Sequence, residues 1–377
     1  MKKLNITFLL PGAPCAPTGG AKVVYEYANR LSHRGHSVTV VHADIIQTDL
    51  PIWKKASRVP VYYYYRAFQR FDPGGWFQLD NSVRLLWVPS FSERYIPNAD
   101  VVIATAWQTA EWAAEYRSTK GERFYLVQHL ETWSGPEKRV LDTWTAPLKK
   151  IVISRWLKGI GDRLGENSCY VPNGLDFDRF RLDIAPEARS PERIMMLYHR
   201  SDWKGSGDGL RALASVKEQV PSLRATLFGV PRRPRHLPDW IDYRCQPAQD
   251  VLCNLYNEAS IFVAPSWSEG WGLPASEAMM CGAAVAATDI GGHQEFAIHE
   301  KTALLSPAKD SEHLAKNILR LIGDSSLRLR LAYGGHGYIQ QFSWKRAVDH
   351  LESLLMKTVE PVSVAQSSES CTQSLSR

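Results

Sequence analysis

The chain lacks the sequence features by which several common protein classes are identified. Its 377 residues include no apolar run that approaches about 18 residues, so we expect no membrane-spanning helix. The six cysteines are scattered, with no C-x-x-C pair and no Cys/His cluster at zinc spacing. This usage indicates reduced cytoplasmic thiols, without a disulfide framework and without a structural metal.

Two common nucleotide-binding signatures are also missing. The first glycine-rich loop contains Gly12, Gly19 and Gly20, which form neither G-x-G-x-x-G nor a P-loop. A dinucleotide dehydrogenase and a P-loop NTPase are therefore disfavoured. The net charge of +6 is a mild excess that suits anionic ligands or an anionic membrane surface, and it does not by itself indicate nucleic acid.

The N-terminus has only a weak signal-peptide pattern. The apolar stretch 4–10 is short and is interrupted by Asn5 and Thr7, so a first buried strand explains it better than a leader. The length is sufficient for about two α/β domains. We expect a cytoplasmic location, with peripheral attachment to the inner face of the membrane as an alternative.

The stretch 261–289 has the most informative pattern. A short apolar run, 261–265, precedes a polar loop, and a second apolar run, 283–288, closes the stretch. Pro274 lies where a helix would begin and Gly282 where it would end. The pattern predicts strand, loop, helix and strand, which is the unit of a parallel sheet.

The loop of this unit combines glycines with two carboxylates. Glycines allow the backbone to approach a ligand, and the N–H groups of a following helix favour an anion. Glu269 lies in the loop and Glu277 in the expected first helical turn, where each can accept hydrogen bonds from a pair of hydroxyls. A sugar nucleotide presents this combination of groups. Alternatively, Glu277 only complements the helix dipole, and Glu269 is an exposed loop acid.

Glu269 and Glu277, with Gly-Trp-Gly-Leu-Pro between them, resemble the E-x7-E motif of retaining glycosyltransferases of family 4. The segment 171–180, VPNGLDFDRF, is similar to the PNGVD…F sequence that links the two domains of that family. The resemblance implies that the first Glu contacts the transferred sugar and the second contacts the ribose. The segment 291–295, GGHQE, is similar to the family's Gly-Gly-x-x-Glu turn, and plain turn chemistry explains it equally well.

The first part of the chain alternates apolar runs with helical periodicity. We expect a strand at 4–10, a loop at 12–20, a helix at 21–32 and a strand at 36–41. This unit resembles the first unit of family 4, which implies that the loop with Gly19 and Gly20 approaches the donor phosphate and the acceptor. The alternative is a tight loop before a helix. Further strands are expected at 83–88, 101–104, 124–127, 151–154 and 169–171.

Other candidate groups follow the carboxyl ends of expected strands, where open α/β sheets bind ligands. His129 follows strand 124–127 and is similar to a family histidine near the transferred sugar, or else it is a surface residue. Arg200 and Lys204 follow strand 194–198 and match an Arg and a Lys-Gly of the family. Two cations in one loop can converge on a diphosphate, or they form a solvated basic loop.

The stretch 53–71 combines basic and aromatic residues and contains no Asp or Glu. Three interpretations remain open. The first is a strand at 59–65 with a solvated basic edge, the second a surface for a membrane or a glycan acceptor, and the third a nucleic-acid site. No RNA- or DNA-binding module accompanies the stretch, so nucleic acid is the least favoured partner.

The resemblance implies an α/β chain with the GT-B architecture, in which two Rossmann-like domains face a cleft. We expect an N-terminal domain at 1–182 on the acceptor side and a C-terminal domain at 183–342 on the nucleotide-sugar side. A crossover helix at 343–360 is expected to return to the first domain. A disordered tail, rich in serine, is expected at 361–377.

The activity that the resemblance implies is transfer of a glycosyl group from a nucleotide sugar to a glycan or lipid-linked acceptor, with retention of configuration. The candidate catalytic residues are Glu269, His129, Arg200 and Lys204. The candidate donor-binding residues are Gly19, Gly20, Arg200, Lys204, Glu269, Gly270, Trp271, Gly272, Leu273 and Glu277. The two cations and the loop N–H groups would stabilise the leaving diphosphate.

No metal or cofactor is expected to take part. The only Asp-x-Asp triplet, Asp176-Phe177-Asp178, lies in the segment already matched to the interdomain link, so we do not interpret it as a metal site. The resemblance suggests synthesis of cell-surface polysaccharide or glycoconjugate. A GT-B sugar-nucleotide epimerase and a catalytically silent nucleotide-sugar-binding scaffold are the alternatives.

Overall fold

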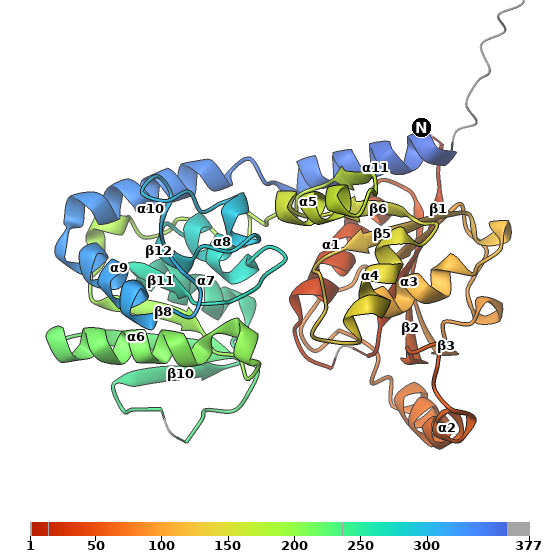
Figure 1. Cartoon of the computed structure of the whole chain (residues 1–377), viewed down its shortest axis with the longest axis horizontal. Coiled ribbons are helices and arrows are strands. Elements are labelled where there is room, and N and C mark those ends of the chain that lie inside the picture. Colours follow the sequence, from red (N-terminus) through yellow and green to blue (C-terminus); the bar gives the residue numbers. More distant parts are fainter. Residues whose placement is uncertain (1, 14, 236, 360–377) are drawn as a thin grey trace, which may run out of the picture.

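Two parallel β-sheets form the framework of the molecule (Figure 1). The computed structural model describes residues 2–13, 15–235 and 237–359. The first sheet has the strand order β3-β2-β1-β4-β5-β6-β7, and the second has the order β10-β9-β8-β11-β12-β13. Neighbouring strands pair in parallel throughout both sheets. The expected pair of Rossmann-like α/β domains is confirmed.

The first domain contains the seven-stranded sheet and its helices. Its strands are β1 (Asn5–Pro11), β2 (Ser37–Ile45), β3 (Arg84–Ser90), β4 (Val101–Ala104), β5 (Glu122–Val127), β6 (Lys149–Val152) and β7 (Ser168–Tyr170). Its helices are α1 (Gly19–His33), α2 (Ile52–Ala67), α3 (Trp107–Ala114), α4 (Glu137–Thr145) and α5 (Arg155–Arg163), with short 3-10 turns η1 (Glu93–Tyr95) and η2 (Ser118–Lys120).

The second domain contains the six-stranded sheet. Its strands are β8 (Arg193–Leu197), β9 (Arg224–Gly229), β10 (Ile241–Cys245), β11 (Ile261–Ala264), β12 (Ala284–Thr288) and β13 (Ala303–Ser306). Its helices are α6 (Ser206–Gln219), α7 (Gln249–Glu258), α8 (Leu273–Met280), α9 (Ser311–Gly323) and α10 (Ser325–Ile339), with turns η3 (Pro186–Ala188), η4 (Asp202–Lys204) and η5 (His293–Glu295).

The strand order places the loops that matter for function. Strands β4, β11 and β12 are buried at every residue, as expected for apolar strands covered on both faces. In the first sheet β1 lies between β2 and β4, and in the second β8 lies between β9 and β11. Such reversals open a crevice at the carboxyl ends of the strands, where open α/β folds bind ligands.

The last helix, α11 (Trp344–Val359), returns to the first domain and runs along its edge (Figure 1). Arg34 at the end of α1 forms ion pairs with Asp349, at 2.6 Å, and with Glu352. His36 also contacts Glu352, with 2.9 Å between Nε2 and Oε1. The crossover implied by the resemblance is therefore present. The tail expected at 361–377 lies outside the described residues.

The strand considered at 59–65 is wrong, because these residues belong to helix α2. The four consecutive tyrosines favour a strand by intrinsic preference. Contacts with the domain instead recur at helical spacing. Tyr62 stacks on Trp87 with ring centroids 6.2 Å apart, Tyr65 stacks on the same indole at 5.5 Å, and Arg58 donates to Asp44 at 3.0 Å. Among the described residues, none of the helices is both long and apolar enough to cross a membrane.

Candidate functional site

The candidate site lies where loops of the two domains meet. Gly19 begins α1, and a Cβ built on it would lie 3.5 Å from Cδ1 of Leu273, which begins α8. The carbonyl oxygen of Gly20 accepts a hydrogen bond from Nε2 of Gln128 at 3.3 Å. Two helix N-termini therefore approach each other across the domain boundary. Their free N–H groups form an environment that favours an anion.

The loop before α8 packs tightly against the first domain. A Cβ on Gly270 would overlap the carbonyl oxygen of Gln128, so only glycine allows this approach to the end of β5. Gly272 has φ +106°, in the left-handed region that side chains disfavour, and it is the N-cap of α8. Trp271 is buried, and its Nε1 donates to Ser276 at 3.0 Å. Gly270 thus serves a contact between domains, a reason that the sequence alone did not reveal, whereas Gly272 is required by the backbone conformation at the start of α8.

Glu269 is held by cationic and polar neighbours of its own domain. Nζ of Lys204 lies 2.7 Å and 2.8 Å from its two carboxylate oxygens, and Oγ of Ser266 donates at 2.8 Å. Burial alone would raise the pKa of Glu269, but the Lys204 ammonium and these hydrogen bonds outweigh burial and hold the pKa below its ordinary value. The carboxylate is therefore ionised, and the alternative of an exposed loop acid is wrong.

Glu277 lies in the second turn of α8, so its predicted place in the first turn is wrong. Its side chain is buried and accepts two hydrogen bonds, from Nζ of Lys22 at 2.7 Å and from the Tyr256 hydroxyl at 3.1 Å. Lys22 belongs to α1, so this ion pair joins the two domains. Glu277 therefore links the two domains, a contact that the helix-dipole alternative does not explain.

Arg200 and Lys204 are placed differently in the structure. Lys204 is the last residue of η4. Its ammonium forms the ion pair with Glu269 and also lies 4.4 Å from the ring centroid of Trp203. Arg200 is exposed in the loop after β8. The convergence of both cations on one diphosphate stays a prediction.

His129 lies in the domain boundary, two residues after β5. Its Nε2 is 3.4 Å from Oγ of Ser268, and its ring lies edge-on to Trp133, with centroids 4.1 Å apart. Burial lowers the pKa of His129 to about 4, and the field of Glu269 only partly opposes this. The imidazole is therefore neutral near pH 7. The alternative of a plain surface histidine is wrong.

Several residues of the boundary carried no recognised signal in the sequence. Lys22 was one helical lysine among many, and Trp133 and Trp203 were ordinary loop aromatics, although their rings lie 4.7 Å apart across the boundary. Trp133 and Trp203 come a few residues after the expected strands 124–127 and 194–198, and this position was the available signal.

Glu131 accepts a hydrogen bond from the Trp107 N–H at the start of α3, at 2.9 Å, and burial raises the pKa of Glu131 to about 7. It thereby holds the loop that carries His129.

The turn at 291–295 also joins the domains. Glu295 accepts hydrogen bonds from the backbone N–H of Arg155, the first residue of α5, and from the Tyr170 hydroxyl at 2.7 Å. The side chain of Asp176, from the Asp-x-Asp triplet, caps the N–H of Arg179 at 3.1 Å. Within the described part of the chain, no three His, Cys, Asp or Glu side chains are grouped as they would be around a metal ion.

A hollow of about 680 Å³ lies away from this boundary. It is lined by the amino ends of β8, β9 and β10 and by the end of α7. Ligands of open α/β folds bind at the opposite, carboxyl ends of the strands. The boundary between the domains is therefore the better candidate site.

Comparison with known proteins shows which family and which fold the chain resembles. Residues 194–324 match the family described as glycosyl transferases group 1. The sucrose-phosphate synthase structure from Thermosynechococcus elongatus has a TM-score of 0.70 at 18% identity and covers 94% of this chain and 99% of that chain. Anabaena HepE, in complex with UDP and glucose, also has a TM-score of 0.70, at 16% identity, covering 94% of this chain and 100% of that one. These neighbours show the GT-B fold.

Curated relatives are more similar in sequence but over a shorter length. The D-inositol 3-phosphate glycosyltransferase of Saccharomonospora viridis is 34% identical over 206 residues, which are 48% of this chain and 48% of the relative. The protein of the same name from Streptomyces bingchenggensis is 34% identical over 190 residues, 45% of this chain and 40% of the relative. The chain thus spans about half the length of the curated relatives it matches. The match to the glycosyl transferases group 1 family lies within the second domain.

Proposed function

We propose that the protein transfers a sugar from a nucleotide-sugar donor to an acceptor, with retention of configuration. One observation carries the proposal. Two carboxylates of the unit around α8, half-buried Glu269 and buried Glu277, are each bonded to a lysine, and the lysine on Glu277 comes from the first turn of α1. A sugar nucleotide offers hydroxyls to both carboxylates and a diphosphate between them.

The donor would lie along the unit around α8. Lys22 now donates to Oε1 of Glu277. The ribose would replace Lys22 and donate its hydroxyls to that oxygen. The diphosphate would meet the N–H groups of 270–273, together with Lys204 and Arg200. Glu269, ionised and fixed by Lys204, would accept hydrogen bonds from hydroxyls of the transferred sugar.

The reaction breaks the bond between the anomeric carbon and the diphosphate oxygen and forms a bond from that carbon to an acceptor oxygen. Negative charge grows on the diphosphate, and fixed cations and N–H groups lower the barrier because they need no reorganisation. The leaving phosphate would take the acceptor proton on the same face of the sugar. Neutral His129 can donate or accept a hydrogen bond there. No step assigned here needs a metal.

The acceptor would bind on the side of the first domain. We include a glycan or a lipid-linked acceptor and synthesis of cell-surface polysaccharide or glycoconjugate in the proposal, with the protein on the inner face of the membrane. Exposed Trp133 beside His129 supports a sugar-binding surface, because aromatic faces stack on sugar rings.

Thermal stability in the presence of UDP, GDP, ADP and dTDP tests the donor site. A nucleotide that binds the folded chain raises the melting temperature by mass action. We expect a shift with one nucleotide, and its loss in Glu277→Ala. With the matching sugar nucleotide, release of nucleoside diphosphate supports the transferase. Interconversion of two sugar nucleotides without acceptor would indicate an epimerase, and binding without release would indicate a silent scaffold.

A further inference from the structure

Large exposed apolar side chains gather on one helix outside the candidate site. Ile52 is 86% exposed, Trp53 68% and Phe68 67%, and Val59, Tyr63 and Tyr64 of the same segment are also exposed. Elsewhere in the described chain such side chains occur singly. Contiguous exposed apolar surface on a water-soluble domain marks an interaction site.

Helical spacing explains why these residues share one face. Arg58, Tyr62 and Tyr65 turn toward β2 and β3, where they contact Asp44 and Trp87. At about 100° per residue, the opposite side of the helix is almost wholly apolar. We call this side the outer face of α2; it consists of Ile52, Trp53, Ala56, Ser57, Val59, Pro60, Tyr63, Tyr64 and Ala67, with Phe68 at the C-cap.

The outer face is bordered by positive charge. The segment 51–71 contains Lys54, Lys55, Arg58, Arg66 and Arg70 and no Asp or Glu. Of these, Arg58 is neutralised by Asp44, whereas Lys54 and Arg70 are exposed. An apolar strip with Trp and Tyr between basic borders is the pattern of a helix that lies in the interface of an anionic bilayer.

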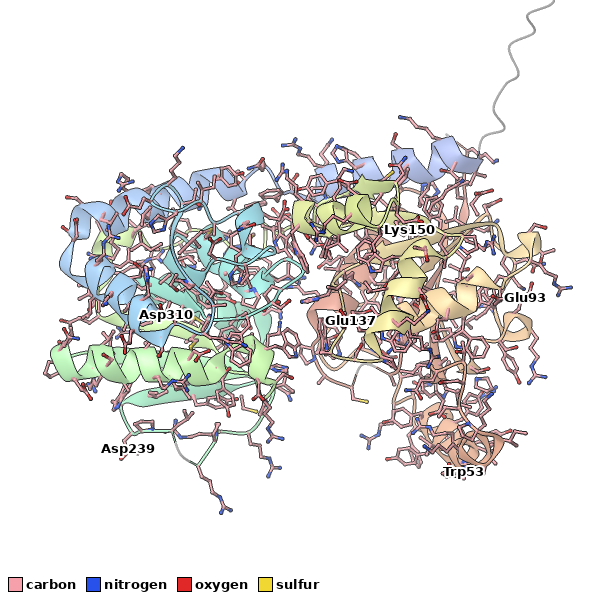
Figure 2. The ribbon with its side chains drawn as sticks, viewed as in Figure 1. Trp53, Glu93, Glu137, Lys150, Asp239 and Asp310 are labelled. Atoms are coloured by element: carbon pink, nitrogen blue, oxygen red, sulfur yellow. The ribbon has the colours of Figure 1, made fainter. Side chains whose placement is uncertain are left out.

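The helix also projects in a direction that permits such contact. Figure 1 shows α2 standing away from the first domain at its lower end, so the helix projects from the body of that domain. Figure 2 places Trp53 on α2 and Asp239 of the β9–β10 connection at the lower ends of the two domains. That connection carries exposed Arg232 and Arg235. An anionic surface that spans the lower ends of both domains would lie against this connection and its arginines as well.

Other occupants fit the outer face less well. A second copy of the chain would bring one basic border against another, which is unfavourable. A glycan binds in a concave site with several polar groups, whereas this face lies on a projecting helix and is nearly all apolar. Nucleic acid would use the charges but would leave aliphatic Ile52 and Val59 in water.

We infer that the outer face of α2 docks the protein on the surface of an anionic lipid bilayer, with Arg232 and Arg235 as a second, weaker contact. The aromatic and aliphatic side chains enter the headgroup region, and the basic borders attract anionic lipid. The inference does not depend on glycosyl transfer. It is tested without any sugar nucleotide, so its failure and that of the proposed function are distinguishable.

The test is co-sedimentation of the full chain with vesicles of phosphatidylcholine alone or mixed with phosphatidylglycerol. We expect binding to the mixed vesicles, weakened by salt, and little binding to the neutral ones. The double variants Trp53→Ser/Phe68→Ser and Lys54→Glu/Lys55→Glu should each bind at least about tenfold more weakly. Arg232→Ala/Arg235→Ala should lose about threefold.

The matched control is Ile184→Ser/Val251→Ser, which removes two exposed apolar side chains of the second domain and should bind as wild type does. Unchanged melting temperatures show that the α2 variants fold. Equal binding of the Trp53/Phe68 variant and wild type would overturn the inference. So would a wild-type dimer that this variant dissociates, or binding to an oligonucleotide with no binding to vesicles.

Discussion

Glu269 and Glu277 belong to one loop–helix unit, yet the lysines that hold them come from different domains. Glu269 is bonded to Lys204 of its own domain, whereas Glu277 is bonded to Lys22 of the other. If the domains separate, the first pair moves as part of one body and the second breaks. The end of the site assigned to the sugar is thus preorganised, and the end assigned to the ribose depends on domain position.

The largest effect is expected at the preorganised end. Lys204→Met leaves the Glu269 carboxylate without its cation and removes one charge from the path of the diphosphate. Release of nucleoside diphosphate from the sugar nucleotide should fall by about 10²–10³-fold. The free energy of unfolding should fall by about 1.5–3 kcal/mol. Lys316→Met, an exposed lysine on α9, is the control and should change neither; full turnover in Lys204→Met would refute the assignment.

Contact between the domains can be tested at Gly270. The Cβ of Gly270→Ala would overlap the Gln128 carbonyl, so the domains must shift, at a cost of about 1–3 kcal/mol in the closed arrangement. We expect turnover to fall about tenfold or more, measured at saturating sugar nucleotide. Gly337→Ala is the counterpart, because a Cβ there meets no atom within 4 Å and should only stabilise α10. Equal activity of both variants would show that the contact does not matter for turnover.

The neutral state of His129, beside the Glu269 end, predicts a pH dependence of stability. Its pKa is lowered from 6.5 to about 4 in the folded chain, so between these values the unfolded chain binds a proton that the folded chain does not. The folded chain therefore keeps its full free energy of unfolding above the pKa of His129 in the unfolded chain. It loses part of that free energy as the pH falls toward the pKa of His129 in the folded chain. Urea denaturation of wild type should lose about 1–3 kcal/mol more over this window than His129→Gln loses. Parallel profiles would contradict the assigned burial.

The smallest effect is expected at the end that depends on domain position. Lys22→Met frees the Glu277 oxygen that the ribose would use, so nucleotide affinity should rise by about threefold to tenfold, measured by calorimetry. The control is Lys316→Met. A weaker affinity instead would mean that Lys22 itself binds the diphosphate, and the proposed exchange would be wrong.

Much of the unit around α8 was predictable because its signals are local. Pro274 lies in the first turn of the helix, Gly282 follows its end with φ +80°, and the apolar run before the loop became β11. Glu277 was predicted in the first turn of the helix but lies in the second. The helix starts earlier than expected, because Gly272 is its N-cap and Leu273 its first residue.

The rest depends on contacts between distant parts of the chain. Lys22 and Glu277 are 255 residues apart, and nothing near either residue indicates the other. Helix α2 was missed because its tyrosines favour strands. Its helical form is stabilised by stacking on Trp87 of strand β3. Local sequence preference correctly predicted the unit around α8. At exposed helix α2, contacts with distant residues outweigh that preference.

The central claim is a division of roles between two carboxylates, and parallel measurements on Glu269→Gln and Glu277→Gln test it most directly. Calorimetry gives the affinity for the nucleotide that stabilises the chain, and hydrolysis of its sugar nucleotide gives turnover. We predict that Glu269→Gln keeps affinity within about threefold and loses about 10²-fold in turnover, whereas Glu277→Gln loses about 10–100-fold in affinity. Equal losses of affinity in both variants, with turnover of Glu269→Gln intact, would contradict the account.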